Sequence, residues 1–89
     1  MNKAEILKQV DLEYQWQQYL DRVKVTEAEL LPIQCQEMKR AFYGACGQML
    51  VLLRDSVGEL SDRDGVLAMQ NMMNQIQTFW ENEVKKSGH

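Results

Sequence analysis

The sequence predicts an all-α fold, with an N-terminal helix followed by a long antiparallel helical hairpin, assembled as a homo-oligomer. Apolar residues recur at spacings of three and four, and only one proline and five glycines interrupt the 89 residues, which predicts helices. The short length predicts the oligomer, because such a chain buries only roughly 60% of its unfolded surface and gains stability from a partner. The length also predicts a single helical domain over residues 1–89.

The first expected helix covers residues 3–23. Its apolar side chains follow helical spacing along one face, and further apolar and aromatic side chains cover a neighbouring face. This breadth predicts that more than one surface of the helix is covered in the assembly. The first face carries Ile6, Leu7, Val10, Tyr14, Leu20 and Val23, and the second carries Leu12, Trp16 and Tyr19.

A break precedes the second expected helix, which covers residues 32–57. Thr26 and Glu29 have the spacing of a capping box, and Pro32 removes a backbone donor, so we expect a short helical turn and a restart near Pro32. Gly58 is expected to close the second helix as its C′ residue. The seam of this helix has coiled-coil spacing and consists of Cys35, Met38, Phe42, Ala45, Met49 and Leu52.

Two glycines, Gly44 and Gly47, lie inside this second helix. Each lowers helix stability by about 1 kcal/mol relative to alanine, so their presence needs a reason. The favoured reason is close packing of helix backbones. The alternative is a ligand, or its phosphate, that approaches the backbone there.

The third expected helix covers residues 62–85. Ser61 is a favoured N-cap residue, and aspartates in the first turn with lysines in the last turn complement the helix dipole. The short link at residues 58–60 predicts that the second and third helices form the antiparallel hairpin. The seam of the third helix consists of Val66, Met69, Met73, Ile76 and Trp80.

Composition argues against several classes of partner and location. Ten Lys and Arg against thirteen Asp and Glu give a net charge of −3, which disfavours binding to long nucleic acids. The longest apolar run, residues 49–53, is far shorter than the about 20 residues of a membrane span, and the polar start lacks a signal peptide. Cys35 and Cys46 would lie about 16 Å apart on one helix, too far for a disulfide. Free thiols are typical of a reducing compartment, so we expect a cytoplasmic protein that contacts no membrane.

The sequence does not predict an enzyme. The one histidine, His89, is the last residue, which leaves no histidine inside the fold for acid–base catalysis or for a His/Cys metal site. No Gly-rich phosphate-binding loop is present in the sequence. We therefore expect no catalytic residue, no metal and no cofactor.

Cations close to aromatic residues indicate a binding function instead. Positive charge suits the phosphates of a nucleotide-like ligand, and aromatic rings suit its bases. The alternative is that these residues are ordinary exposed charges and half-buried core rings. The candidate ligand-binding residues are Tyr19, Arg22, Lys24, Lys39, Arg40, Tyr43 and Arg63.

The helix plan and the stretch Ser61–Met69, SDRDGVLAM, resemble the phage anti-CBASS cyclic-oligonucleotide sponges. The stretch is similar to the family's Ser-Arg-Glu-x-Ser-Leu-Ala-Leu run, which opens the last helix, and Trp80 fits the aromatic position downstream. Lys39 and Arg40 resemble the basic position early in the central helix that contacts the signal. Tyr19 best matches the stacking tyrosine of that family.

The resemblance implies a phage anti-defence protein that acts in the bacterial host cell without catalysis. Such a sponge sequesters a cyclic nucleotide-type immune signal, either a cyclic oligonucleotide or a cyclic ADP-ribose isomer, at subunit interfaces of a homo-oligomer. The family examples are hexamers. In this mechanism Tyr19 or Tyr43 would stack a base, while phosphates would meet Lys39, Arg40 and Arg63.

Two other functions stay open. The chain is alternatively a small helical oligomeric module for protein–protein interaction or inhibition, for which methionines of the third helix such as Met69, Met72 and Met73 would form an adaptable contact surface. The same methionines could instead fill an ordinary core. A purely structural oligomer without a ligand is the remaining possibility.

Overall fold

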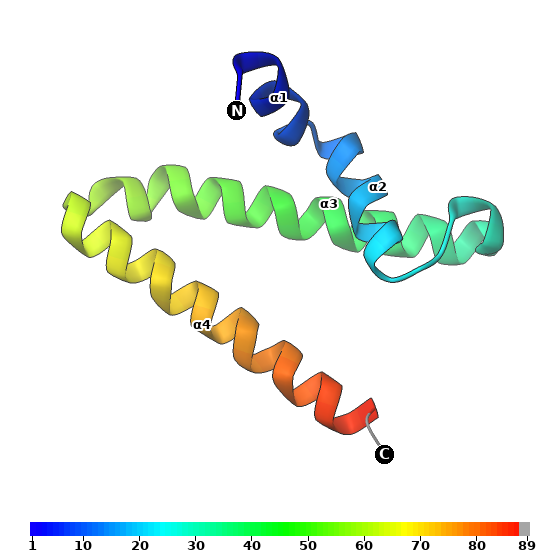
Figure 1. The fold of residues 1–89 in the computed structure, drawn as a ribbon. Coiled ribbons are helices and arrows are strands. Elements are labelled where there is room, and N and C mark those ends of the chain that lie inside the picture. Colours follow the sequence, from blue (N-terminus) through cyan, green and yellow to red (C-terminus); the bar gives the residue numbers. More distant parts are fainter. Residues whose placement is uncertain (88–89) are drawn as a thin grey trace. The chain divides into compact units, whose positions relative to one another are not determined.

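The structure is a computed structural model that describes residues 1–87, and all regular structure in that range is helical (Figure 1). This confirms the predicted all-α class. His89, the one histidine of the sequence, lies outside the described residues. The elements are α1 (Lys3–Gln9), α2 (Leu12–Arg22), the 3-10 turn η1 (Glu27–Glu29), α3 (Pro32–Asp55), the 3-10 turn η2 (Val57–Glu59) and α4 (Asp62–Ser87).

Two compact units make up the chain, Met1–Met49 and Leu50–His89. The first holds α1, α2, η1 and most of α3, and the second holds the end of α3, η2 and α4. That the two units form one domain stays a prediction, as do the antiparallel hairpin and the homo-oligomer.

The first helix differs from the prediction, because residues 3–23 form two helices instead of one. Asp11 begins a new helix: its side chain accepts a hydrogen bond from the backbone N–H of Tyr14 at 2.9 Å. The backbone N–H of Asp11 is bonded to the carbonyl of Lys8 at 3.2 Å, which closes α1. An aspartate that caps the following turn stabilises a helix start, and here it outweighs the apolar spacing that continues across the break.

The predicted break before α3 is present, but the predicted capping box is wrong: Thr26 makes no side-chain cap hydrogen bond, and its hydroxyl donates to Oε1 of Glu29 at 3.0 Å. Residues 27–29 form one short 3-10 turn, and α3 starts at Pro32. Proline is favourable at the first position of a helix, because a backbone N–H there would have no partner within the helix. Gln34 supports the restart, because its Oε1 atom accepts a hydrogen bond from the backbone N–H of Leu31 at 3.0 Å.

Lys24 follows the C-cap residue of α2, and its backbone lies in the left-handed region, with a φ of 61°. Its N–H is bonded to the carbonyl of Asp21, and the N–H of Val25 is bonded to that of Leu20, both at 3.1 Å. These are the two bonds of a Schellman motif, in which Lys24 occupies the C′ position that glycine usually holds.

An aromatic cluster lies at the centre of the first unit, where α2 packs across α3 (Figure 1). Trp16 and Leu20 are the buried residues among those described. The Trp16 ring lies 5.5 Å from that of Phe42 and 6.2 Å from that of Tyr19, measured between centroids, and Tyr19 lies 5.7 Å from Phe42. Trp16 and Leu20 were expected on two different faces of the first segment, but both are buried.

In the second unit, η2 joins the end of α3 to α4. Gly58 lies within this turn, and no described glycine has a positive φ, so the predicted left-handed C′ cap at Gly58 is wrong. Ser61 is the N-cap of α4 as predicted, because its Oγ atom accepts a hydrogen bond from the backbone N–H of Asp64 at 3.1 Å.

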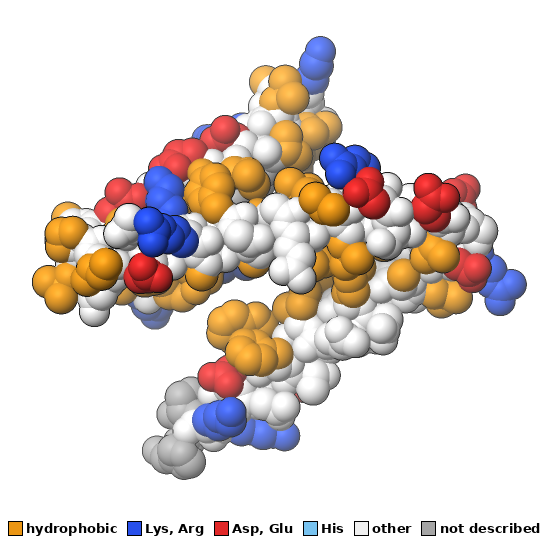
Figure 2. Space-filling view, turned by 180° about the vertical axis from the view of Figure 1, so that it is seen from behind, with side chains coloured by type: hydrophobic (Ala, Val, Ile, Leu, Met, Phe, Trp, Pro, Cys, Tyr) orange, Lys and Arg blue, Asp and Glu red, His pale blue; other side chains and the backbone are white. Residues whose placement is uncertain are grey.

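Most large apolar side chains remain exposed, and Figure 2 shows hydrophobic side chains reaching the surface in many places. Val10 of α1 is 66% exposed and Met73 of α4 is 61% exposed. Within the first unit, nothing lies within 4 Å of a Cβ atom built on Gly44 or Gly47, so no neighbour there accounts for the two glycines. In the part of the chain that the structure describes, no helix is both long and apolar enough to cross a bilayer.

Candidate functional site

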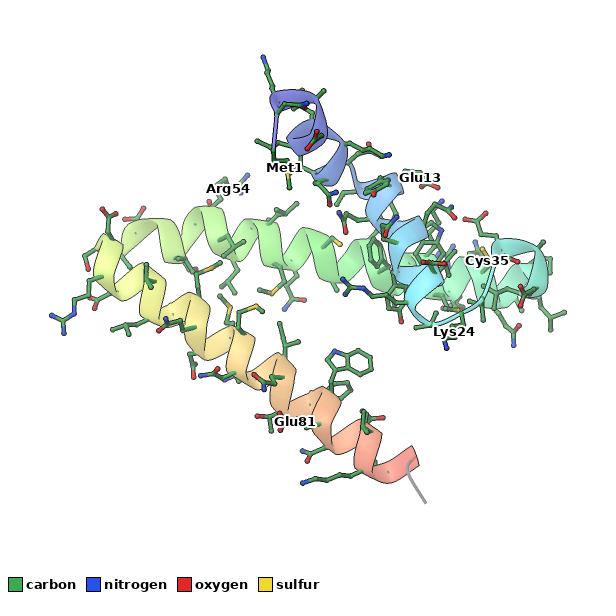
Figure 3. All side chains as sticks on the ribbon, in the orientation of Figure 1. Met1, Glu13, Lys24, Cys35, Arg54 and Glu81 are labelled. Carbon is green, nitrogen blue, oxygen red and sulfur yellow. The ribbon has the colours of Figure 1, made fainter. Side chains whose placement is uncertain are left out.

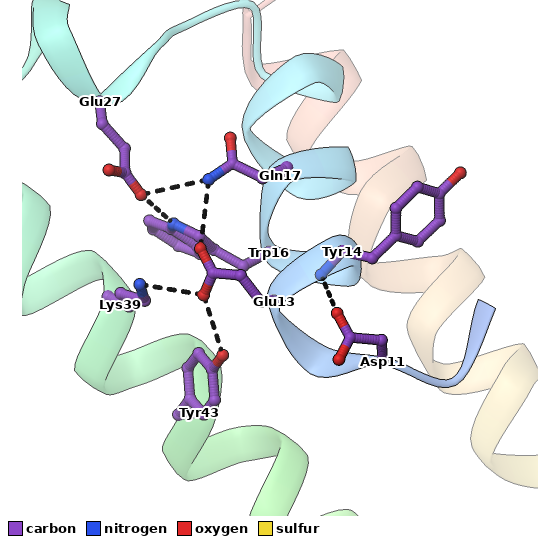
Figure 4. A network of polar contacts seen from close by, with 8 residues as sticks. All are labelled: Asp11, Glu13, Tyr14, Trp16, Gln17, Glu27, Lys39 and Tyr43. Carbon is purple, nitrogen blue, oxygen red and sulfur yellow. Dashed lines mark hydrogen bonds and ion pairs between the residues drawn. The ribbon is translucent and has the colours of Figure 1, made fainter. Parts of the chain in front are cut away.

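Glu13 of α2 is the centre of a polar network against α3 (Figure 4). Its Oε2 atom lies 3.1 Å from Nζ of Lys39 and accepts a hydrogen bond from the hydroxyl of Tyr43 at 3.2 Å. The side-chain amide of Gln17 donates to the other oxygen, Oε1, at 3.4 Å. One carboxylate thus joins two side chains of α3 to α2.

Glu27 extends this network to η1. Its Oε1 atom accepts a hydrogen bond from Nε1 of Trp16 at 2.7 Å and another from Nε2 of Gln17 at 3.3 Å. The buried indole therefore has its N–H satisfied, as buried polar groups require. Lys39 adds contacts with the rings, because its Nζ atom lies 5.8 Å from the centroid of Trp16 and 6.0 Å from that of Tyr43.

The network changes the acidity of its members. The hydrogen bond from Lys39 lowers the pKa of Glu13 below its ordinary value, and the same bond raises the pKa of Lys39. Partial burial, followed by the hydrogen bond to Glu13, raises the pKa of Tyr43. At neutral pH the carboxylate and the ammonium are therefore both charged and the phenol is protonated, which is the state that the network requires.

A shallow groove of about 350 Å³ lies on α3 beside this network and is lined by Gln36, Lys39, Arg40 and Tyr43. Three of its four side chains are predicted ligand-binding residues, so the structure brings these three together. Arg40 contacts Glu37 at 3.6 Å, and both side chains are more than 60% exposed. Such an exposed pair is weak, so Arg40 can exchange Glu37 for another anion.

The other four predicted residues do not line this groove. Tyr19 packs in the aromatic cluster and lines a separate cavity of about 320 Å³ with Phe42 and three other side chains. Arg22 lies in the last turn of α2, and Lys24 follows it in the Schellman turn. Arg63 belongs to the second unit, in the first turn of α4.

Sequence reasoning missed Glu13, Gln17 and Glu27, and it did not predict the hydrogen bond from the Trp16 indole to Glu27. The pair of Glu13 and Lys39 depends on how α2 lies on α3, which no local spacing reveals. A signal did exist for Trp16, because Leu20 follows it by four residues, a spacing that places two helical side chains on the same face.

Residues 1–87 contain no group of three His, Cys, Asp or Glu side chains placed to hold a metal ion. Cys35 and Cys46 are both free and half-buried. Comparison of the chain with protein-family models, with curated proteins and with solved structures found no match.

Proposed function

We propose that this chain is a non-enzymatic interaction module that works as a homo-oligomer, with apolar helix faces as its contact surfaces. The observation that supports the proposal is the burial pattern. Only Trp16 and Leu20 are buried among the described residues, whereas large apolar side chains of α1, α3 and α4 are exposed. Soluble monomers rarely leave extended apolar patches in water, so such surfaces mark sites of association.

The magnitude favours association as well. Each Å² of apolar surface removed from water contributes about 25 cal/mol. A core of two buried side chains contributes little against the conformational entropy of ordering the chain. Burial of helix faces between copies would supply the missing stabilisation. If a second copy packs closely against α3 at Gly44 and Gly47, that close approach also explains why glycine is present at both positions.

Sedimentation equilibrium over a hundredfold range of concentration tests this proposal. We expect particles of a fixed multiple of 10.4 kDa that dissociate on dilution, with helix content falling in parallel. A stable, fully helical 10.4 kDa particle at every concentration would contradict the proposal.

A second candidate function is sequestration of a small anionic ligand of the cyclic-nucleotide type, as in a phage anti-defence sponge. The groove with Lys39, Arg40 and Tyr43 favours it, because two cations and a 36% exposed ring meet at one place. Lys39 would have to share its charge between Glu13 and a phosphate, whereas Arg40 gives up only a weak exposed pair. Tight binding would lower the free signal by mass action.

Thermal shift and calorimetry with cyclic di- and trinucleotides and cyclic ADP-ribose isomers test the second candidate. A ligand at a hundred times its Kd stabilises the folded protein by about 2.7 kcal/mol, a clear shift in melting temperature. Arg40→Ala should abolish the shift, while the matched control Arg54→Ala, an exposed arginine paired with Asp55 and outside the groove, should retain it. If both variants retain the shift, or if both lose it, this groove is not the binding site. If no ligand shifts the melting temperature of the unaltered protein, the ligand class is rejected.

A further inference from the structure

The middle of α4 carries no charge. Between Asp64 and Glu81 the sequence contains no Asp, Glu, Lys or Arg, although these residues lie on an exposed helix. Figure 3 shows side chains along the length of α4, with Glu81 toward its C-terminal end. A helix that faces water normally presents charged residues on its outer face, so this segment has the composition of a contact surface.

An apolar seam runs along this charge-free segment. Its residues alternate at spacings of three and four, and each is between 42% and 61% exposed. An open groove of about 810 Å³ begins at η2 and is lined in part by the first three seam residues. This seam, with its groove, has the spacing at which one helix accepts the side chains of another. The seam consists of Val66, Met69, Met73, Ile76 and Trp80.

Charge at the two ends of α4 indicates which helix fits the seam and in which direction. Asp62 and Asp64 lie in the first turn with Arg63 between them, which leaves a net negative charge there, and Lys85 and Lys86 lie in the last turn. Two copies of α4 side by side in parallel would place like charges together at both ends. Two antiparallel copies place aspartates beside lysines at both ends and also oppose their helix dipoles, which is favourable.

We propose that α4 pairs with α4 of a second copy of the chain in antiparallel orientation, an inference that rests on the proposed self-association and names its surface. In the register where Met73 faces Ile76 of the second copy, Met69 faces Trp80. In an antiparallel pair, residues that face each other have numbers with a constant sum. Asp64 therefore lies level with Lys85 of the second copy in the same register. Arg63 then lies level with Lys86 of the second copy, but Lys86 contacts Glu83 of its own helix at 3.5 Å, so the pair of Asp64 with Lys85 supports this register. The pair has the two-fold symmetry usual for homodimers.

Charge exchange at the ends of α4 tests the orientation, measured as the dissociation constant by sedimentation equilibrium at low ionic strength. D62K/D64K and K85E/K86E should each weaken association about tenfold, and the combination of all four substitutions should restore it. A parallel pair predicts no such restoration, because single and combined exchanges would then leave like charges opposed. Equal dissociation constants in all four proteins would overturn the antiparallel pairing.

A second pair of variants tests the surface itself. Met73→Glu places a charge at the centre of the seam and should weaken association at least tenfold, whereas Asn71→Glu, on the opposite face of α4, should not. Circular dichroism of both variants checks that α4 stays helical. Unchanged assembly in Met73→Glu would overturn the α4 surface while leaving self-association intact, and an unaltered protein that is monomeric throughout would reject both proposals.

Discussion

The Nζ atom of Lys39 on α3 lies 3.1 Å from Oε2 of Glu13 on α2, and the two side chains remain 39% and 53% exposed. An isolated pair with this exposure contributes little to stability. This pair differs because Glu13 also accepts a hydrogen bond from Tyr43, and Lys39 lies over two aromatic rings. Its effect is to fix the position of α2 on α3.

Glu13→Gln should destabilise the first unit in a pH-dependent manner. Because the folded pKa of Glu13 is lowered, its contribution is present above the ordinary value of 4.5 and is lost as pH falls through the folded pKa. Because the folded pKa of Lys39 is raised, its contribution is present below 10.5 and is lost as pH rises through the folded pKa. Urea unfolding measured from pH 3 to 11 gives the unfolding free energy of both proteins. The difference between Glu13→Gln and the unaltered protein should be largest between pH 4.5 and pH 10.5.

Glu37→Gln is the control for that series, because Glu37 forms only the exposed pair with Arg40. Its unfolding free energy should follow that of the unaltered protein at every pH. A Glu13→Gln difference that is constant across the whole range would show that the charge of Glu13 has no part in holding α2.

Trp16→Ala should lower the unfolding free energy by about 3–5 kcal/mol, because it removes the largest buried side chain and leaves a cavity. Leu12→Ala is the comparison, since Leu12 is an only partly buried residue one turn earlier on α2, and it should have a clearly smaller effect. Chemical unfolding followed by circular dichroism measures both. Equal losses would show that Trp16 is not the centre of the core.

The substitutions Gly44→Ala and Gly47→Ala should each raise the stability of the dissociated chain by about 1 kcal/mol. Both positions are helical, and nothing in the first unit lies within 4 Å of the added methyl group. Gln48→Gly on the same helix should have the opposite sign and a similar size. Thermal melts at high dilution give these values, and a loss of stability in either alanine variant would reveal a contact that the first unit does not contain.

Trp80 should report association directly. It is 53% exposed, so its fluorescence in the separate chain should resemble that of a hydrated indole. In a Trp16→Phe background, where Trp80 is the remaining tryptophan, the emission should shift to shorter wavelength as the concentration rises and the indole leaves water. Addition of Met73→Glu should abolish the shift, and a maximum that does not depend on concentration would remove Trp80 from any interface.

The sequence predicts those helix termini that have a characteristic residue, such as a proline at the first position or a serine at the N-cap. Pro32 at the start of α3 and Ser61 before α4 are local preferences that tertiary packing did not override. The break at Asp11 was missed although an aspartate is also a capping residue, because the apolar spacing continues on both sides of it. Periodicity shows which residues share a face and gives no information on whether a helix is continuous.

The candidate site was predictable only in part. Lys39, Arg40 and Tyr43 came together because they are neighbours on one helix, where spacings of three and four bring side chains together. Tyr19 lies in the aromatic cluster, with its ring 5.7 Å from that of Phe42, and does not line this groove, so its role with a ligand stays a prediction. The partnership of Glu13 with α3 depends on the angle between two helices, which no short stretch of sequence encodes.

The left-handed backbone of Lys24 has a consequence for how this chain can vary through evolution. Its φ of 61° is accessible to glycine without strain and to asparagine or aspartate at small cost, whereas valine and isoleucine are excluded by their branched Cβ atoms. Natural variants that retain the turn after α2 should therefore replace Lys24 freely by glycine or asparagine. The backbone conformation at position 24 limits which residues fit this turn, whereas the side-chain charge takes no part in the turn's two hydrogen bonds.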